Sequence, residues 1–471
     1  MATPAGFSFD FTPTYISLHK YMSTGLYTCL YVMLRSPAVA GLSGADLELD
    51  SCWRNCYTSG ATSEPDEIHC TPVSILMVSN PHPSADALFT PQFVLACAVH
   101  FCGAMAMSLY ILFPLVIRHL GGSELIIGTY AGITGASAVI ARLPVGRWLD
   151  TLGRRRVLAL AGLLHVTAWC GFLALDHLGV GSVACVVIYG LASGSLFASY
   201  FTYASDITPI SRRAEGISLF GIWGILPNGL GPLLGEFLIH RAGFAAYFLA
   251  GAAFAFTSLC LSRFLPETVH ALAQGSTDPA PQAAGGANRG LLFVLSMTFF
   301  FGAAVNSILT FLAPFAQTRG SGAVGGFFMS YACAAVMVRV ATPRLPDRVG
   351  LTRVLVPALF LYATAMLLVP RVSGVTALIV VGAMCGVGHG YAFPIFNVLA
   401  IEQVSPGFRG RAVSWLTAMF DLGNTVANPL LGAVAEWLGY RTMFSVAACG
   451  VLAAATTIWH KGAAYLAPRP T

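Results

Sequence analysis

The sequence has few charged residues. Only 10% of its 471 residues are charged, whereas 56% are hydrophobic and the mean hydropathy is +0.73. An average soluble domain carries roughly a quarter charged residues. A chain this poor in charge cannot cover a water-facing surface, and a soluble protein of this length would divide into domains that expose more polar surface. Lipid must therefore cover much of the chain, which excludes a soluble enzyme and predicts an all-α integral membrane protein.

Several catalytic signatures are absent as well. The sequence contains no phosphate-cradling Gly-x4-Gly-Lys-Ser/Thr loop, no His-Glu-x-x-His element and no Gly-x-Ser-x-Gly element. The net charge of +5 comes mostly from short arginine clusters between apolar runs, which suit a membrane surface better than a nucleic acid. We therefore expect no enzyme activity, no ATP hydrolysis, no cofactor and no nucleic-acid partner.

The twelve cysteines show no paired pattern. Most stand singly in apolar runs, where a free cysteine packs as a small hydrophobic residue. Cys52 and Cys56 give only a weak metal or disulfide signal, because no second pair stands at a matching spacing. We expect no metal site.

Long apolar runs follow one another from Pro91 onward, and a helix needs roughly 20 apolar residues to cross the hydrocarbon core. The predicted spans are residues 92–116, 124–146, 156–175, 180–204, 216–239, 243–264, 290–315, 322–343, 353–370, 374–402, 410–434 and 439–460. The gap from Pro266 to Arg289 has the Pro, Gly, Ala and polar composition of a linker. We therefore predict twelve transmembrane helices in two pseudo-symmetric six-helix bundles.

The predicted domains follow from this division. Residues 1–88 form an N-terminal extension that fits no span, because Arg35 and Pro37 interrupt its apolar run. We expect this extension to be disordered, or translation to begin at Met77. The other segments are an N-terminal six-helix bundle at 89–265, a cytoplasmic linker at 266–289, a C-terminal six-helix bundle at 290–462 and a cytoplasmic tail at 463–471.

The two halves repeat each other with a single offset. The segment from Arg142 to Leu158 shares seven residues with the segment from Arg339 to Leu355, each 197 positions later. Pro232-Leu233-Leu234-Gly235 recurs as Pro429-Leu430-Leu431-Gly432 at the same offset. Two segments with one offset indicate a parallel duplication about an axis along the membrane normal. That architecture predicts a binding site between the halves, near the membrane midplane.

The distribution of arginine predicts the orientation. With both termini in the cytoplasm, the inner loops and tail hold about three times as many Arg and Lys residues as the outer loops. The opposite orientation would invert this asymmetry. We therefore expect a multi-pass protein of a cell membrane, the inner membrane of a bacterium, with cytoplasmic N- and C-termini. In the lipid bilayer we expect a monomer.

A charged motif, Gly146-Arg147-Trp148-Leu149-Asp150-Thr151-Leu152-Gly153-Arg154-Arg155-Arg156, joins the second and third predicted spans. It resembles the loop signature of the major facilitator superfamily, a glycine, then an aspartate, then Gly-Arg-Arg. Glycine permits close approach of a neighbouring helix, and an aspartate can pair with arginines or with a helix N-terminus. The resemblance implies a gating role for Gly146, Arg147, Asp150, Gly153, Arg154 and Arg155, and for Asp347 in the repeat. Anchoring of the topology is a second role for the arginines.

Two further segments carry the resemblance. Gly231-Pro232-Leu233-Leu234-Gly235 resembles the Gly-Pro-x-x-Gly element of the superfamily's antiporters, which implies a hinge at Gly231, Pro232 and Gly235. Gly190 stands where its drug and proton antiporters carry an arginine. The segments at 386–394, 409–412 and 420–423 look like the arabinose-efflux-permease type. The resemblance covers residues 90–460 and implies the fold, but not the substrate.

One acidic residue is predicted deep in the membrane. Asp421 lies about ten residues, or roughly 15 Å, inside the span at 410–434. A charge at that depth is costly and marks a functional candidate. Asp421 is either a proton-coupling carboxylate or a structural partner of Arg142. For Arg142 and Arg339 we favour snorkelling to the cytoplasmic face over contact with substrate.

Other polar residues inside the spans are candidates for proton coupling or for binding a substrate. His100 and His389 could relay protons near neutral pH, although a lone histidine in a helix bundle is more often a packing residue. Asn228 and Asn424 offer hydrogen bonds without charge.

These features predict a secondary active transporter of a small organic solute. We expect it to alternate access by rocking its two halves, and to export the solute against an inward flow of protons. Two alternatives stay open. A uniporter or a proton-linked importer is compatible with the missing arginine, and a transporter-like sensor would move nothing.

Overall fold

A computed structural model describes residues 88–268, 288–320, 324–405 and 408–466. The predictions for the N-terminal extension before Leu88, for linker residues 269–287 and for the tail from residue 467 lie outside the described residues. Every element within the described residues is helical, so the prediction of an all-α chain is confirmed there.

The helices occur in two runs along the chain. The first run is α3 (Pro91–Leu109), η2 (Tyr110–Leu112), α4 (Phe113–His119), α5 (Glu124–Leu152), α6 (Arg154–Phe172), α7 (Val180–Ile207), η3 (Ile210–Arg212), α8 (Arg213–Ile225) and α9 (Pro227–Ser262). The second run is α11 (Arg289–Thr318), α12 (Gly325–Ala341), α13 (Leu345–Val349), α14 (Leu351–Leu368), α15 (Val375–Glu402) and α16 (Arg409–Tyr465). We call these runs the first half and the second half.

Local sequence explains where several helices begin and end. Thr90 caps α3 by accepting a hydrogen bond from the Phe93 N–H at 3.1 Å, and Asn288 caps α11 in the same way. Gly153 and Gly350, which are equivalent in the sequence repeat, have φ angles of 94° and 107° and separate α5 from α6 and α13 from α14. Residues with a Cβ rarely adopt such angles, which explains why both positions are glycine.

The two longest helices each contain a glycine with a non-helical backbone. Gly243 in α9 has a φ of 77°, and Gly439 in α16 has a φ of 80°. Each of these elements therefore consists of two helical segments that meet at a kink. The kinks coincide with the predicted breaks between the spans at 216–239 and 243–264, and between those at 410–434 and 439–460.

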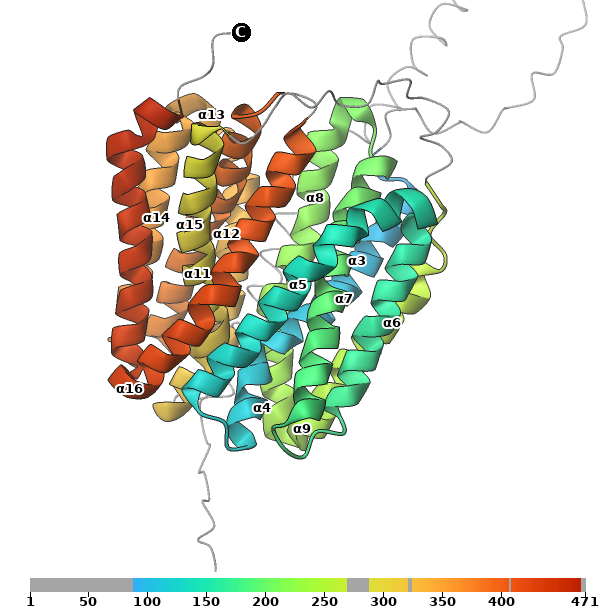
Figure 1. The fold of residues 1–471 in the computed structure, drawn as a ribbon, viewed down its shortest axis with the longest axis vertical. Coiled ribbons are helices and arrows are strands. Elements are labelled where there is room, and N and C mark those ends of the chain that lie inside the picture. Colours follow the sequence, from blue (N-terminus) through green and yellow to red (C-terminus); the bar gives the residue numbers. More distant parts are fainter. Residues whose placement is uncertain (1–87, 269–287, 321–323, 406–407, 467–471) are drawn as a thin grey trace, which may run out of the picture. The chain divides into compact units, whose positions relative to one another are not determined.

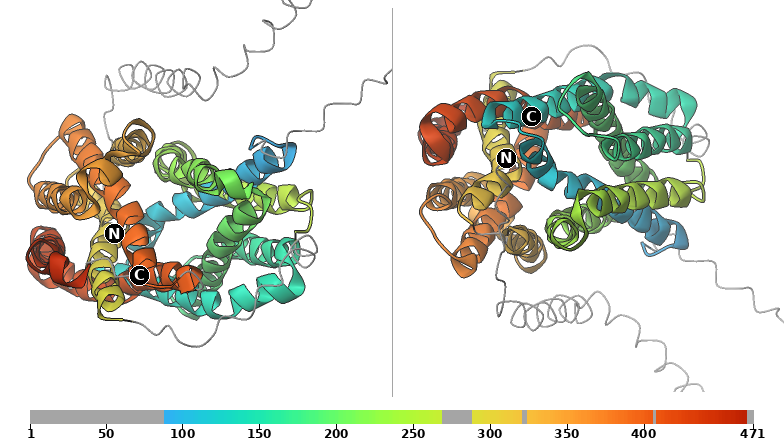
Figure 2. Two further views of the ribbon diagram at one scale, coloured as in Figure 1. Left: turned by 90° about the horizontal axis from the view of Figure 1, so that it is seen from above. Right: turned by 90° about the horizontal axis from the view of Figure 1, so that it is seen from below.

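The helix bundle has two ends, which we call the linker end and the closed end and define by the residues found there. The linker end carries Asp150, Arg154 and Thr268, and it is the upper end in Figure 1, where α13 lies. The closed end carries the loop from His119 to Ser123 and the kink at Gly439, and it is the lower end in Figure 1, where α4 lies. Across the halves, α5 packs against α16 and α9 packs against α12. Figure 2 shows the two halves side by side in views from both ends.

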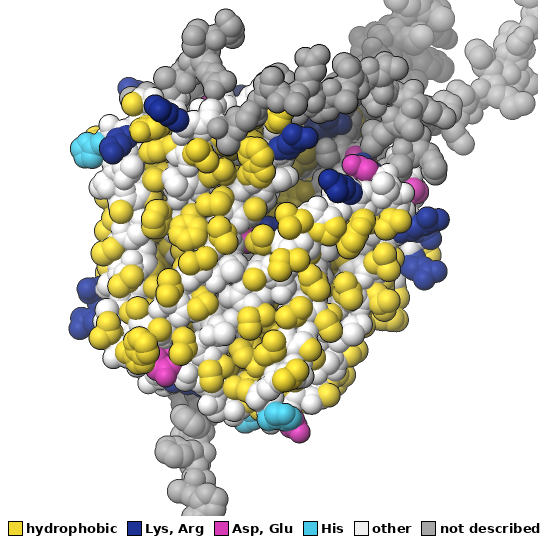
Figure 3. Space-filling model, in the orientation of Figure 1, with side chains coloured by type: hydrophobic (Ala, Val, Ile, Leu, Met, Phe, Trp, Pro, Cys, Tyr) yellow, Lys and Arg dark blue, Asp and Glu magenta, His cyan; other side chains and the backbone are white. Residues whose placement is uncertain are grey.

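The surface of the helices is apolar over most of its height. Large hydrophobic side chains such as Leu143 and Phe264 are exposed, the former by 77%. In Figure 3 hydrophobic side chains cover the middle of the visible face, and charged side chains gather mainly toward its upper and lower margins. Eight helices among the described residues are long and apolar enough to cross a membrane. The chain is a multi-pass membrane protein.

Candidate functional site

A cavity of about 270 Å³ lies between the two halves. It is lined by residues of α3, η2, α4, α5, α7 and α9 from the first half and of α11 and α16 from the second half. Its polar lining consists of Thr134, Arg142, Ser193, Asn228, Asn306, Thr310, Asp421 and Asn424. The sequence repeat predicted a site in this position.

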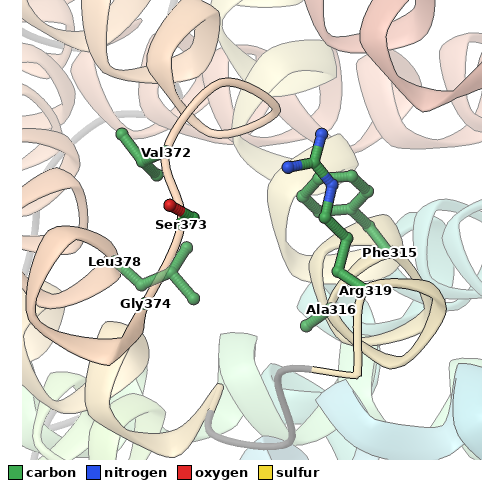
Figure 4. Close-up of a pocket in the computed structure, with 7 residues that line it drawn as sticks. All are labelled: Phe315, Ala316, Arg319, Val372, Ser373, Gly374 and Leu378. Atoms are coloured by element: carbon green, nitrogen blue, oxygen red, sulfur yellow. The ribbon is translucent and has the colours of Figure 1, made fainter.

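A second cavity is too small for an organic solute. It has a volume of about 70 Å³ and lies at the closed end of the second half, between the end of α11 and the turn that precedes α15 (Figure 4). Arg319 lies over the ring of Phe315 and donates a hydrogen bond to the carbonyl oxygen of Pro370 at 2.7 Å. A cavity of this size holds only a few water molecules.

An ion pair in the central cavity joins the halves. Nη1 of Arg142 on α5 donates a hydrogen bond to Oδ2 of Asp421 on α16, and the two side chains are 19% and 20% exposed. The guanidinium group also lies 5.6 Å from the ring centroid of Phe197, and its buried Nε has no hydrogen-bond partner among the described residues. The snorkelling that we favoured for Arg142 is therefore wrong, because Asp421 holds this side chain in the cavity. The predicted structural partnership of the two residues is present.

Three asparagines give the cavity groups that can hydrogen-bond to a solute. Oδ1 of Asn228 accepts a hydrogen bond from Ser108, and Oδ1 of Asn424 accepts one from Asn428. Nδ2 of Asn306 donates to the carbonyl oxygen of Gly302 at 2.8 Å. Within the described part of the chain, this leaves the Nδ2 groups of Asn228 and Asn424 as donors and Oδ1 of Asn306 as an acceptor.

Aromatic rings form an apolar part of the lining. The hydroxyl of Tyr110 is hydrogen-bonded to Thr134 at 2.9 Å, and the hydroxyl of Tyr189 donates to a backbone carbonyl. The rings of these two tyrosines stack, with centroids 3.8 Å apart. Because protein groups satisfy the hydroxyls, the tyrosines contribute mainly ring surface to the cavity.

The two candidate histidines do not line the cavity. His100 is 3% exposed and stacks on Phe220, with ring centroids 4.5 Å apart. His389 is hydrogen-bonded to the hydroxyl of Tyr331 and lies against the ring of Phe301. These aromatic surroundings match the packing role, which we gave as the more common one for a lone histidine.

Ion pairs and hydrogen bonds join the charged motif at 146–156 to distant parts of the first half. Arg154 pairs with Asp150 at 3.1 Å and with Asp206 of α7 at 2.8 Å. Glu267, which follows α9, accepts hydrogen bonds from the backbone N–H groups of Arg154 and Arg155 at 2.8 and 3.1 Å. Sequence reasoning found Asp150 as a partner for the arginines but missed Asp206 and Glu267, which lie 52 and 113 positions from Arg154.

Three other gating candidates are exposed to solvent in this arrangement. Gly146 and Arg147 are exposed, and a Cβ added to Gly146 would meet no atom within 4 Å. The close approach that we expected at Gly146 is therefore absent here. Asp347 lies in α13 and is also exposed.

The predicted hinge residues pack within the first half. A Cβ on Gly231 would lie 2.6 Å from the Cβ of Ser108, and a Cβ on Gly235 would lie 2.9 Å from the side chain of Leu112. These glycines, with Pro232 between them, bring α9 close to α3 and η2. The non-helical residue of α9 is Gly243, eight positions beyond Gly235.

The halves pack through glycines toward the closed end. A Cβ on Gly128 would lie 2.2 Å from the carbonyl oxygen of Asn428, and one on Gly432 would lie 2.6 Å from that of Glu124. In the other seam, a Cβ on Gly229 would lie 2.9 Å from the Cα of Met329. Backbone therefore touches backbone in both seams, α5 with α16 and α9 with α12.

The charged motif gives a first testable prediction. Asp150 is 73% exposed in this arrangement, so we expect its role in the arrangement in which the linker end closes. Asp150→Asn should lower the turnover of transport about five- to tenfold, as expected for the loss of a charged hydrogen bond. Asp347→Asn is the matched control and should change it less, because Leu351 and Thr352 replace the arginines after the glycine. Equal losses, at equal amounts of folded protein, would contradict this asymmetry.

The sequence matches a transporter family over most of its length. The profile of the Major Facilitator Superfamily matches residues 95–365 and 343–470. The multi-drug resistance efflux pump PmrA of Streptococcus pneumoniae is 25% identical over 366 residues, which are 73% of this chain and 89% of the pump. An uncharacterized MFS-type transporter of Salmonella typhimurium is 24% identical over 365 residues, 73% of this chain and 90% of that protein.

Solved structures resemble the chain in fold. The crystal structure of a D-xylose-proton symporter aligns with a TM-score of 0.65 at 15% identity. The alignment covers 78% of this chain and 96% of the symporter. At this identity the likeness concerns the fold alone.

Proposed function

The chain belongs to the Major Facilitator Superfamily, and on this premise we propose that it is a secondary active transporter that exports a small organic solute in exchange for protons. The central cavity holds the solute, and the two halves rock to expose it at the two membrane faces in turn. The direction is supported by the similarity to PmrA, which is described as an efflux pump. The arabinose-efflux-permease type remains a prediction from the sequence.

The proposal includes twelve spans in two six-helix bundles. Two of the eight long apolar helical stretches, Glu215–Ser262 and Arg409–Gly462, are divided by the kinks at Gly243 and Gly439, so each supplies two spans. The shorter apolar helix α12 and the helix α6, which begins with three arginines, supply the remaining two. The bundles are then residues 89–265 and 290–462, joined by a linker at 266–289.

The orientation and location are also proposed. The linker end carries the arginine-rich motif at 146–156, so the positive-inside rule puts that end in the cytoplasm, together with both termini. The closed end, where the halves touch through Gly128 and Gly432, then faces outward, and the linker end, where Gly146 and Arg147 are exposed, faces the cytoplasm. The bilayer is the inner membrane of a bacterium, and the protein works as a monomer.

The Arg142–Asp421 pair is the observation that carries the proposal. It bridges the two halves in the central cavity, where a charge without a partner is costly. A proton that binds Asp421 removes the negative charge and weakens the bridge. Release of the proton restores it. Proton binding at this carboxylate is thereby linked to the contact between α5 and α16.

The lining favours a small solute that carries no net charge. A volume of about 270 Å³ lies below the roughly 300–1,000 Å³ of pockets for drug-sized ligands. The cation and the anion of the lining, Arg142 and Asp421, compensate each other. The asparagine amides offer hydrogen bonds, and the tyrosine rings offer apolar surface, so the solute combines a polar edge with an apolar face.

Transport by the purified full chain in proteoliposomes tests this function. A panel of radiolabelled neutral, cationic and anionic solutes is offered with and without an imposed pH gradient. We expect a small neutral solute to move against the proton flow, and the gradient to raise its accumulation. A solute flux that does not depend on the pH gradient would indicate a uniporter. Movement of the solute in the same direction as the protons would indicate an importer, and solute binding without flux would indicate a sensor.

A further inference from the structure

The helices α5 and α12 both begin at the closed end, and each lacks a side-chain cap of its own. The N-cap residue of α5 is Ser123 and that of α12 is Val324, and neither side chain caps its helix. The first N–H groups of a helix need acceptors, and the positive end of the helix dipole favours an anion there. Both helices receive a carboxylate from the opposite half.

Glu236 supplies the carboxylate for α12. Glu236 belongs to α9 in the first half, and its two oxygens accept hydrogen bonds from the N–H groups of Val324 and Gly325, at 3.1 and 2.8 Å. The approach is close, because a Cβ on Gly325 would lie 2.9 Å from Oε2 of Glu236 and 2.9 Å from the Cα of Leu233. The side chain of Glu236 is partly buried.

Glu436 does the same for α5, in the opposite direction. Glu436 belongs to α16 in the second half, and its Oε2 accepts a hydrogen bond from the N–H of Leu125 at 2.9 Å. Each half therefore supplies one carboxylate to a helix N-terminus of the other. Glu436 is exposed, so water weakens its contact more than that of Glu236.

We propose that Glu236 and Glu436 are positioning residues for transport, which hold the closed end shut by capping the helices of the opposite half. Both contacts cross the seams that must separate when the closed end opens. While they persist, they stabilise the arrangement in which the two halves touch at the closed end. The inference rests on the alternating access of the proposed function, and it needs neither a known solute nor a known direction of transport.

Glu236→Gln tests the proposal through a distance measurement in the full chain. Spin labels are placed at Val180 and Trp437, which are 89% and 75% exposed and lie near the closed end in opposite halves. The twelve native cysteines are replaced first. Pulsed dipolar spectroscopy in nanodiscs then gives the ratio of long to short distances. We expect Glu236→Gln to raise this ratio about tenfold and the exposed Glu436→Gln about threefold.

A second variant removes a backbone N–H donor of α12 and keeps the charge of Glu236. Val324→Pro deletes one of the two N–H groups that donate to Glu236, and the φ of −81° at this position lies close to the range of proline. Because the two changes break one contact, the double variant should raise the ratio less than the product of the single effects. Glu402→Gln at the end of α15 is the matched control and should leave the ratio unchanged.

The outcomes separate the capping role from the proposed function. The parent protein should show a population with the long distance. If Glu236→Gln and Val324→Pro fold well and leave the distances unchanged, the capping role would be overturned and alternating access would stay intact. A protein that never shows a second distance in the parent or in any variant would overturn alternating access itself. A rise in Glu402→Gln equal to that in Glu236→Gln would also overturn the capping role.

Discussion

Asp421→Asn is expected to abolish solute accumulation driven by a pH gradient, down to the level of liposomes without protein. Asparagine resembles the protonated carboxylic acid in size and polarity but cannot release or bind the proton. The variant should still exchange labelled for unlabelled solute without a gradient, because the cavity and its asparagines remain. Comparing gradient-driven accumulation with gradient-independent exchange in the same proteoliposomes measures the effect.

The contact with Arg142 defines the control for this experiment. In Asp421→Asn the guanidinium group loses its charged partner, and an uncompensated charge in a cavity of the membrane is destabilising by about 3–5 kcal/mol. The loss of the pair should therefore lower yield and thermal stability, and Arg142→Gln added to Asp421→Asn should partly restore them. If Asp421 is only a structural partner, the folded protein should still accumulate solute in response to the gradient. Unaltered gradient-driven accumulation in a well-folded Asp421→Asn protein would rule out the coupling role.

The helical fold could be predicted closely from the sequence, because hydropathy has a simple physical cause. Apolar runs long enough to cross a bilayer can only be helices or parts of closed barrels. The predicted span at 180–204 corresponds to the helix Val180–Ile207, and the predicted span at 374–402 corresponds to the helix Val375–Glu402. Glycine marked the breaks, since Gly243 and Gly439 stand where adjacent predicted spans were separated.

The candidate site was only partly predictable, because the sequence does not show which of several possible partners a side chain contacts. Depth in a span singled out Asp421, and the repeat placed the cavity between the halves. Snorkelling was preferred for Arg142 because helical position alone does not show that Asp421 faces it, 279 positions away. The cost of a buried charge should have favoured the ion pair.

The carboxylates at the closed end had no signal in the sequence. Glu236 and Glu436 lie near the ends of their spans, where charged residues are ordinary. The repeat was no guide either, because the residue equivalent to Glu236 is Ala433, three positions before Glu436. Three positions are nearly one helical turn, so both carboxylates reach comparable places without matching in the alignment. Their role depends on the approach of distant helices.

The glycine seam between α5 and α16 gives the second large expected effect. A Cβ added to Gly128 would lie 2.2 Å from the carbonyl oxygen of Asn428 and 2.9 Å from its carbonyl carbon. These are backbone atoms of α16, so they cannot move aside as a flexible side chain can. Gly128→Ala should therefore force the helices apart at the closed end, at a cost of about 1–3 kcal/mol, which is typical of overpacking.

Gly221→Ala is the matched control for this change. Gly221 lies within α8, and a Cβ there would meet no atom within 4 Å. Alanine stabilises a helix by about 1 kcal/mol relative to glycine, so the two variants should change stability in opposite directions. We expect Gly128→Ala to lower the initial rate of transport at least about tenfold, whereas Gly221→Ala should leave it unchanged.

Distance measurements connect this loss to the proposed rocking of the halves. If the seam must close for the linker end to open, Gly128→Ala should raise the population with a long distance between labels at Val180 and Trp437, in the same direction as Glu236→Gln. The two changes act on different seams, α5 with α16 and α9 with α12, so their effects on the free energy of closure should add. Equal transport rates and equal distances in Gly128→Ala and Gly221→Ala would show that contact between α5 and α16 does not control closure.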